Sequence, residues 1–136
     1  MITNNITSII PQRTPFVMVG SLIEATDKGF ETSYVVSGDN LFLEEGFLQE
    51  PALIENIAQT AAAGFGFLNS QSDEEPKLGF IGAISKLKVH ALPKVDSTIY
   101  TTVTVMFQME NIFLVKGVNK DGNKTLLECE MKIVVT

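Results

Sequence analysis

The stretch of residues 50–68, EPALIENIAQTAAAGFGFL, constrains the fold of this chain more than any other feature. It is long enough for a helix of five turns and is apolar almost all the way round, which is typical of a helix that is buried on every side. Pro51 suits the first helical turn, where its missing N–H is not needed. The stretch therefore predicts a central helix around which the rest of the chain folds.

Two polar side chains interrupt this apolar helix. Glu55 and Gln59 are four residues apart, so they lie on one face, one above the other. A buried carboxylate is costly unless something satisfies or uses it, and the pair therefore predicts the floor of a functional site. The alternative is a glutamate near the helix start that is favoured by the free N–H groups there and does no chemistry.

The composition limits the class of protein. A length of 136 residues favours one domain over residues 1–136, and the net charge of −6 argues against nucleic-acid binding. No apolar run is long enough to cross a bilayer, and the N-terminus lacks the pattern of a signal peptide, so we expect no membrane association and a cytoplasmic protein. One cysteine and one histidine cannot form a metal cluster, and we expect neither a metal nor a cofactor.

Strand patterns flank the helix on both sides. The predicted strands are residues 16–25, 30–36, 78–84, 85–91, 98–109, 112–119 and 125–135, with a short helix at 4–10 and a loop at 69–76. The turns at 27–29 and 120–123 predict hairpins. One helix cannot cover a large flat sheet, so these elements predict an α+β fold in which a curved antiparallel sheet wraps around the helix. A dimer that joins two sheets edge to edge would protect the sheet edges.

This order of elements resembles the hot-dog fold, and within it the 3-hydroxyacyl–acyl carrier protein dehydratases of fatty acid synthesis. Residues 10–16, IPQRTPF, are similar to that family's L-P-H-R-x-P-F segment, with Gln12 in place of the histidine. Glu55 and Gln59 match the family's E-x-x-x-Q on the central helix, in which the glutamate is catalytic. The resemblance covers nearly the whole chain and implies a protein that acts on acyl thioesters.

The chain departs from this family just before the central helix. The family has a G-H-F-P-x-x-P segment there, and its histidine is the catalytic base. Residues 41–51, LFLEEGFLQEP, are shorter and contain no histidine, while His90 belongs to a later strand. This shorter form is similar to a divergent branch, the dehydratase-like proteins of aryl-polyene and flexirubin-type pigment synthesis.

The resemblance assigns roles for the loss of water from a 3-hydroxyacyl thioester, which needs a base, an acid and a donor to the thioester oxygen. Glu55 would be the acid that protonates the leaving hydroxyl, and Gln59 would orient Glu55 or the hydroxyl. The amides of Gly46 and Phe47 are candidate donors to the oxygen. The base is missing from this chain.

Three explanations of the missing base stay open. Glu55 does both jobs; a second hot-dog protein contributes a histidine across a mixed dimer; or the chain is a non-catalytic subunit that holds the acyl chain or stabilises an active partner. A fourth hypothesis is a hot-dog thioesterase, in which Glu55 would activate water or attack the thioester with no histidine. Enoyl thioester as the product indicates a dehydratase, and free acid indicates a thioesterase.

The remaining candidate residues concern the substrate and its carrier. We expect Phe42, Phe47 and Phe80 to line the acyl tunnel. Lys86, Lys88 and His90 alternate along a strand and would share one face, which together with Arg13 is a candidate docking patch for an acidic acyl carrier protein. The sequence leaves open whether an acyl carrier protein or coenzyme A carries the acyl group. It also leaves open whether the chain forms a homodimer or a mixed dimer.

Overall fold

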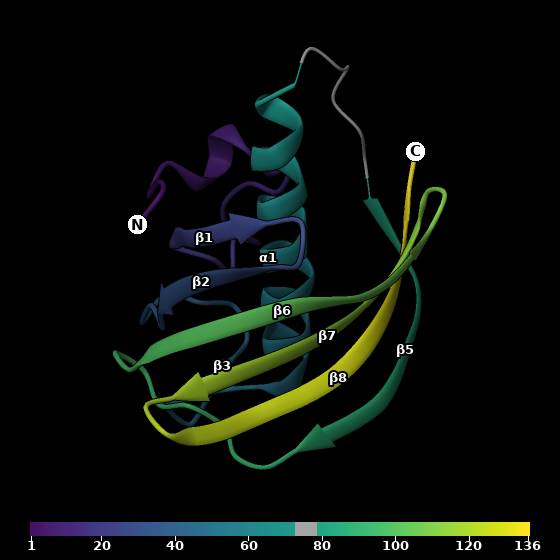
Figure 1. Ribbon diagram of the computed structural model, residues 1–136. Helices are drawn as coiled ribbons and strands as arrows, with labels where there is room; N and C mark the ends of the chain where they lie inside the picture. Colours follow the sequence, from purple (N-terminus) through teal and green to yellow (C-terminus); the bar gives the residue numbers. More distant parts are fainter. Residues whose placement is uncertain (73–78) are drawn as a thin grey trace.

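The expected central helix is present in the computed structural model, which describes residues 1–72 and 79–136. The helix, α1 (Glu50–Ser70), starts with Pro51 in its first turn and has buried residues on several sides. Figure 1 shows the sheet curving around it. This is the α+β arrangement expected from the sequence, and it confirms a curved antiparallel sheet wrapped around one long helix.

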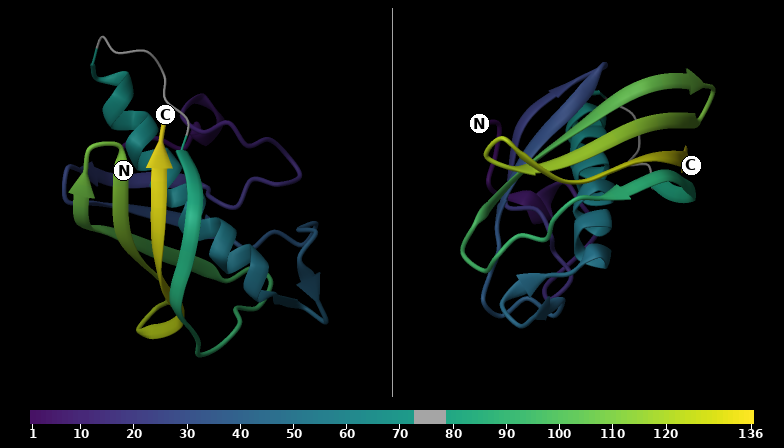
Figure 2. Two further views of the ribbon diagram at one scale, coloured as in Figure 1. Left: turned by 90° about the vertical axis from the view of Figure 1, so that its right-hand side faces the viewer. Right: turned by 90° about the horizontal axis from the view of Figure 1, so that it is seen from below.

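The sheet has six strands in the order β1-β2-β6-β7-β8-β5, with every neighbouring pair antiparallel. A separate two-stranded hairpin, β3-β4, precedes the helix, and a 3₁₀ turn, η1, lies near the N-terminus. The bounds are η1 (Ile6–Ser8), β1 (Ser21–Thr26), β2 (Gly29–Val35), β3 (Leu43–Glu44), β4 (Phe47–Leu48), β5 (Gly79–Val89), β6 (Thr98–Met109), β7 (Ile112–Asp121) and β8 (Lys124–Val135). The two views of Figure 2 show β5 at one edge of the sheet, beside β8.

Three local predictions need correction. The segment 16–20 is not a strand, because side chains of α1 bind its backbone in place of a neighbouring strand. The two strands predicted at 78–84 and 85–91 are one strand, β5, which contains β-bulges that absorb the bend. The helix continues to Ser70, into the loop predicted at 69–76, and residues 73–76 of that loop lie outside the described residues.

Glycines let the helix approach its neighbours closely. A Cβ on Gly64 would lie 2.0 Å from the ring of Phe30, and a Cβ on Gly66 would lie 2.2 Å from the carbonyl oxygen of Ile9. These contacts place β2 on one side of α1 and the N-terminal segment on another. The N-terminal segment is therefore held against the helix backbone, which decides where residues 10–18 run.

A layer of buried polar side chains joins the helix to the sheet. Asn56 donates to the carbonyl oxygen of Met18 at 2.6 Å, and its own Oδ1 accepts from Thr101 and from Asn119. Asn119 also donates to the carbonyl oxygen of Leu53 at 3.0 Å. Because all of these groups are buried, each bond replaces one to water, and the layer fixes the register of helix against sheet.

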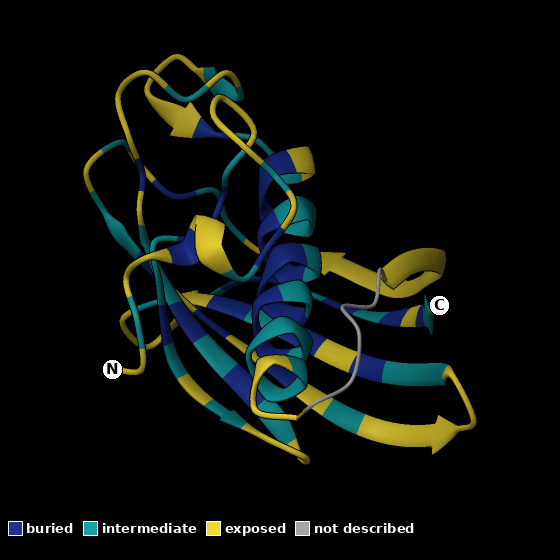
Figure 3. Ribbon diagram, turned by 90° about the horizontal axis from the view of Figure 1, so that it is seen from above, coloured by how far each residue is buried: buried dark blue, intermediate teal, exposed yellow. Residues whose placement is uncertain are grey.

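The two edges of the sheet differ. Strand β1 is bridged by the N-terminal segment, where Ile2 N–H donates to the Leu22 carbonyl and Leu22 N–H donates to that of Thr3, both at 2.8 Å. No described segment pairs with the outer side of β5, and all of its residues are exposed (Figure 3). An uncovered edge of eleven residues is a surface on which another strand can pair.

Ile81, Ile84 and Val89 of β5 pair with core residues of β8 and so face the helix side of the sheet. Each is nevertheless 42–45% exposed, because α1 covers this edge of the sheet only in part. The inner face of the sheet therefore extends beyond the helix that covers it.

Among the described residues, no helix is both long and apolar enough to cross a membrane.

Candidate functional site

A cavity of about 930 Å³ lies between α1 and the first residues of β5. Apolar side chains and backbone form most of its wall, and Glu55 is the one ionisable side chain that α1 contributes. Its lining residues include Gln12, Glu55, Phe80 and Glu110. A cavity of this size between a helix and an open sheet edge can hold an acyl chain.

Gln59 fixes the position of Glu55. Its Nε2 donates to Glu55 Oε1 at 2.9 Å and to the Phe16 carbonyl oxygen at 2.8 Å, while its Oε1 accepts from Met18 N–H at 2.7 Å. Gln59 is fully buried, and both the oxygen and the nitrogen of its amide are hydrogen-bonded. It is therefore placed to orient Glu55 and the 16–18 segment, and it has no surface with which to touch a substrate.

Glu55 itself is half-buried at the cavity wall. Gln59 occupies one carboxylate oxygen, and within the described residues no hydrogen bond occupies the other. The carboxyl group is thus held in one orientation with an oxygen available to a bound molecule. Such a group can give or take a proton, or attack a carbonyl carbon.

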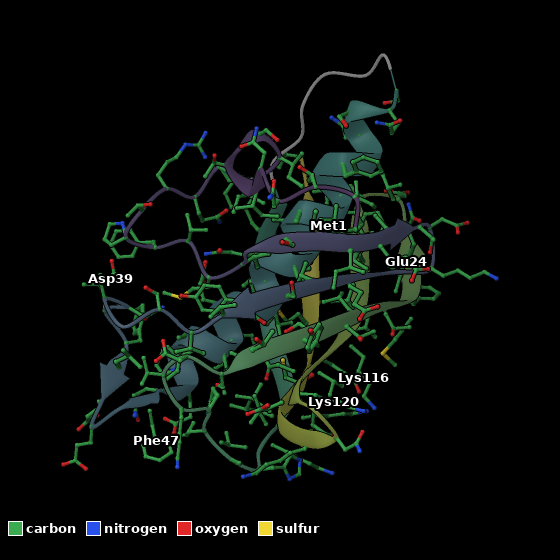
Figure 4. The ribbon with its side chains drawn as sticks, turned by 90° about the vertical axis from the view of Figure 1, so that its left-hand side faces the viewer. Met1, Glu24, Asp39, Phe47, Lys116 and Lys120 are labelled. Carbon is green, nitrogen blue, oxygen red and sulfur yellow. The ribbon has the colours of Figure 1, made fainter. Side chains whose placement is uncertain are left out.

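The predicted tunnel and oxyanion residues separate in space. Phe80 lines the cavity, whereas Phe42, Gly46 and Phe47 do not. Phe42 packs against the core, and Gly46 is the left-handed turn residue of the β3–β4 hairpin, where its carbonyl oxygen accepts from Val95 N–H at 2.9 Å. Figure 4 shows Phe47, the first residue of β4, at the lower end of the molecule. Within this chain, the amides of Gly46 and Phe47 do not face the Glu55 cavity.

Lys86 and Lys88 of β5, with His90 just after the strand, share the outer face of the sheet with two acids of β8. Lys86 lies 3.3 Å from a carboxylate oxygen of Glu130, and His90 lies 3.1 Å from one of Glu128. Lys88 pairs in register with Glu128 and lies on the same face. No histidine lines the Glu55 cavity, since the only one in the chain is bound on this outer face.

Arg13 lies apart from these three residues. Its Nη1 donates to the carbonyl oxygens of Ile10 and Gln12 at 2.7 and 2.8 Å, which stiffens the N-terminal segment. No contact of the described residues joins it to β5. The four predicted docking residues therefore form a cluster of three and a separate arginine.

Cys129 is not a nucleophile of the site. Its side chain is buried on the helix side of β8, and burial, followed by the nearby charge of Glu130, raises the pKa of its thiol to about 11. A thiol with this pKa is protonated at neutral pH and unreactive. Its role is packing in the core, as the sequence indicates.

Sequence reasoning missed Gln12 and Asn56 as contributors to the site. Gln12 lines the cavity with Glu55, and the substitution of glutamine for a histidine in the P-Q-R-T-P-F motif was the available signal. Asn56 lies next to Glu55 and ties α1 to Met18 and to the sheet. An asparagine inside an apolar helix is the signal that would have identified it.

Comparison with known proteins agrees with this geometry. The model of a family described as ApeP-like, ApeP dehydratase, matches residues 4–136. No curated protein matches the chain. The ApeI:P dehydratase heterocomplex of Xenorhabdus doucetiae contains a chain that superposes with a TM-score of 0.88 at 18% identity, over 96% of this chain and 90% of that one.

Two other solved structures share the fold. Cj0977, a sigma28-regulated virulence protein from Campylobacter jejuni, superposes with a TM-score of 0.73 at 14% identity, over 97% of this chain and 96% of that one. A hypothetical thioesterase protein with coenzyme A from Streptococcus pneumoniae has a TM-score of 0.69 at 10% identity, over 96% and 90% of the two chains. The family match, which spans nearly the whole sequence, and the wrapped-helix architecture lead to one conclusion: this chain is a hot-dog protein of the ApeP-like dehydratase family.

Proposed function

We propose that this chain is the glutamate-bearing subunit of a mixed hot-dog dimer that removes water from 3-hydroxyacyl thioesters. The observation that carries the proposal is the position of Glu55. Gln59 holds it at the wall of a largely apolar cavity, and that cavity is also lined by the first residues of the uncovered edge strand β5. A second chain paired with β5 would therefore contribute directly to the site.

The chemistry divides between the two subunits. A base removes a proton from C2 of the acyl chain, the electrons form the C2–C3 double bond, and the C3–O bond breaks. Glu55 gives its proton to the leaving hydroxyl, which departs as water, and the carboxylate is then reprotonated. Since His90 is bound to Glu128 outside the cavity, we assign the base to a histidine of the partner.

The uncovered surface of β5 supports a partner of the same fold. Main-chain pairing along β5 would satisfy its free edge, and the partner's own elements would cover Ile81, Ile84 and Val89. The similar chain from Xenorhabdus doucetiae comes from the dehydratase heterocomplex ApeI:P, which supports a mixed dimer over a homodimer.

The Ile84→Lys variant tests this interface. A lysine here would need to bury its charge on the inner face of the joined sheet, so we expect affinity for a histidine-bearing hot-dog relative to fall about 100-fold. Size-exclusion chromatography with light scattering, supported by titration calorimetry, measures this. Val35→Lys is the matched control, because Val35 is an exposed aliphatic strand residue on β2. Equal binding by both variants would show that the partner does not use β5.

The acyl group needs a carrier that can dock near the site. We propose that an acyl carrier protein docks on Lys86, Lys88 and His90, with Arg13 as a separate contact, and that the protein works in the cytoplasm. Glu128 and Glu130 balance part of the positive charge, so the attraction is local and modest.

Replacing Lys86 and Lys88 with glutamine should weaken carrier binding about fivefold at low salt and less at high salt. Surface plasmon resonance against immobilised acyl carrier protein measures the change. Lys28→Gln, in the exposed β1–β2 turn, is the matched control. If the double variant binds as the control does at low salt, the docking surface lies elsewhere.

A further inference from the structure

The amide of Gln12 takes no part in the proton transfers proposed for Glu55 and the base. Gln12 lines the same cavity as Glu55, and its Oε1 is buried without a hydrogen-bond partner among the described residues. Buried side-chain oxygens in folded proteins nearly always accept a hydrogen bond, so an unpartnered one on a residue that lines a cavity marks a side chain that can accept from a ligand.

The backbone on both sides of Gln12 is fixed to α1. Before it, Ile9 packs against the helix backbone at Gly66, and Ile10 is buried. After it, Gln59 binds the backbone of Phe16 and of Met18. The segment therefore runs along the helix from the level of Gly66 towards that of Gln59, one turn from Glu55.

Arg13 further restricts the conformational freedom of the segment that carries Gln12. Its guanidinium binds the carbonyl oxygens of Ile10 and of Gln12 itself, and Phe16 N–H closes a turn onto the Arg13 carbonyl at 2.9 Å. Gln12 thus sits on a stiff loop whose position is set by the same residue, Gln59, that orients Glu55. A group held in this way is suited to recognising one atom of a ligand.

We infer that Gln12 is the specificity-determining residue for the hydroxyl group on C3 of the substrate, an inference that rests on the proposed function. A hydroxyl group donates one hydrogen bond through its O–H and accepts others at its oxygen. The proton of Glu55 approaches the lone pair of this oxygen, and the hydroxyl hydrogen points to Gln12 Oε1. Glu55 and Gln12 then both bind the hydroxyl group that leaves as water.

The consequence is selectivity for substrate over product. The enoyl product and a saturated acyl thioester have no hydroxyl, so neither can satisfy Gln12, and each leaves the amide oxygen unpartnered. Sites built to bind a hydroxyl reject analogues that lack it, since the buried polar group is then unpaired. Gln12 would thereby favour entry of the 3-hydroxyacyl form and release of the enoyl form.

The test measures binding of two pantetheine amides, 3-hydroxyoctanoyl and octanoyl, to the complex of this chain with its histidine-bearing partner. An amide replaces the thioester, so C2 is too weakly acidic for the analogues to react. We expect the native complex to bind the hydroxy analogue about fivefold to tenfold more tightly, the size of one neutral hydrogen bond. In the Gln12→Met complex the preference should fall to the part that Glu55 supplies, with octanoyl binding unchanged.

A variant that keeps an acceptor separates recognition from packing. Gln12→Glu should retain a preference for the hydroxy analogue, whereas a purely structural role would weaken both analogues equally in Gln12→Met. A preference that survives undiminished in Gln12→Met would overturn the inference about Gln12 and leave the proposed function standing. Failure of the native complex to bind either analogue would overturn the proposed function as well.

Discussion

Replacing Glu55 with glutamine should slow dehydration of a 3-hydroxyacyl carrier protein about 100-fold to 10,000-fold, while the fold stays intact. The substitution keeps the shape of the side chain, and an amide oxygen at this position can still accept the hydrogen bond from Gln59 Nε2. It removes only the acidic proton. The measurement is the single-turnover rate of the mixed complex, with circular dichroism as the check on folding.

Glu110→Gln is the matched control for this variant. Glu110 also lines the cavity, but it lies in the β6–β7 turn, and we assign it no proton transfer. Its rate should stay within about threefold of the native complex. If Glu55→Gln reacted as fast as the native complex, another group would be the acid and the assignment would be wrong.

The largest effect on stability should come from Asn56→Leu. Leucine has a similar volume but no polar atoms, so the Met18 carbonyl and the Thr101 hydroxyl would each lose a buried partner. With two buried groups left unpaired, we expect the free energy of unfolding to fall by about 3 to 5 kcal/mol. Urea denaturation followed by circular dichroism measures this change.

Thr101→Val serves as the milder comparison. It removes one bond to Asn56, whose Oδ1 still accepts from Asn119 at 3.3 Å, so the expected loss is about 1 to 2 kcal/mol. The double variant should lose less than the sum of the two single variants, because both break the same bond. Strict additivity would mean that these side chains do not form the coupled layer described above.

Much of the fold follows from periodicity alone. The apolar stretch from Glu50 onward predicts a central helix because no surface helix has its pattern, and alternation in residues 98–109 predicts β6, whose Ile99, Thr101 and Val103 face the core. The i, i+4 spacing of Glu55 and Gln59 predicts their contact, which the structure has at 2.9 Å. That residues 1–136 form a single domain stays a prediction.

Other features depend on contacts that a local pattern does not carry. Residues 16–20 have the composition of a strand, but their partners are the side chains of Gln59 and Asn56, more than thirty-five residues away. Gly46 precedes the helix closely enough to suggest an oxyanion donor, yet it lies in the β3–β4 turn and does not line the Glu55 cavity. In the proposed reaction the base belongs to a second chain, so the residues of this chain cannot identify it.

The central claim is that the base and the acid reside on different chains. The most direct measurement is the intact mass of a 3-hydroxyacyl carrier protein after incubation with this chain, with a histidine-bearing hot-dog relative, and with both together. The account predicts loss of one water with both, and far slower loss with either alone. Loss of the whole acyl group to this chain alone would identify a thioesterase, and dehydration by this chain alone at the rate of the pair would contradict the shared site.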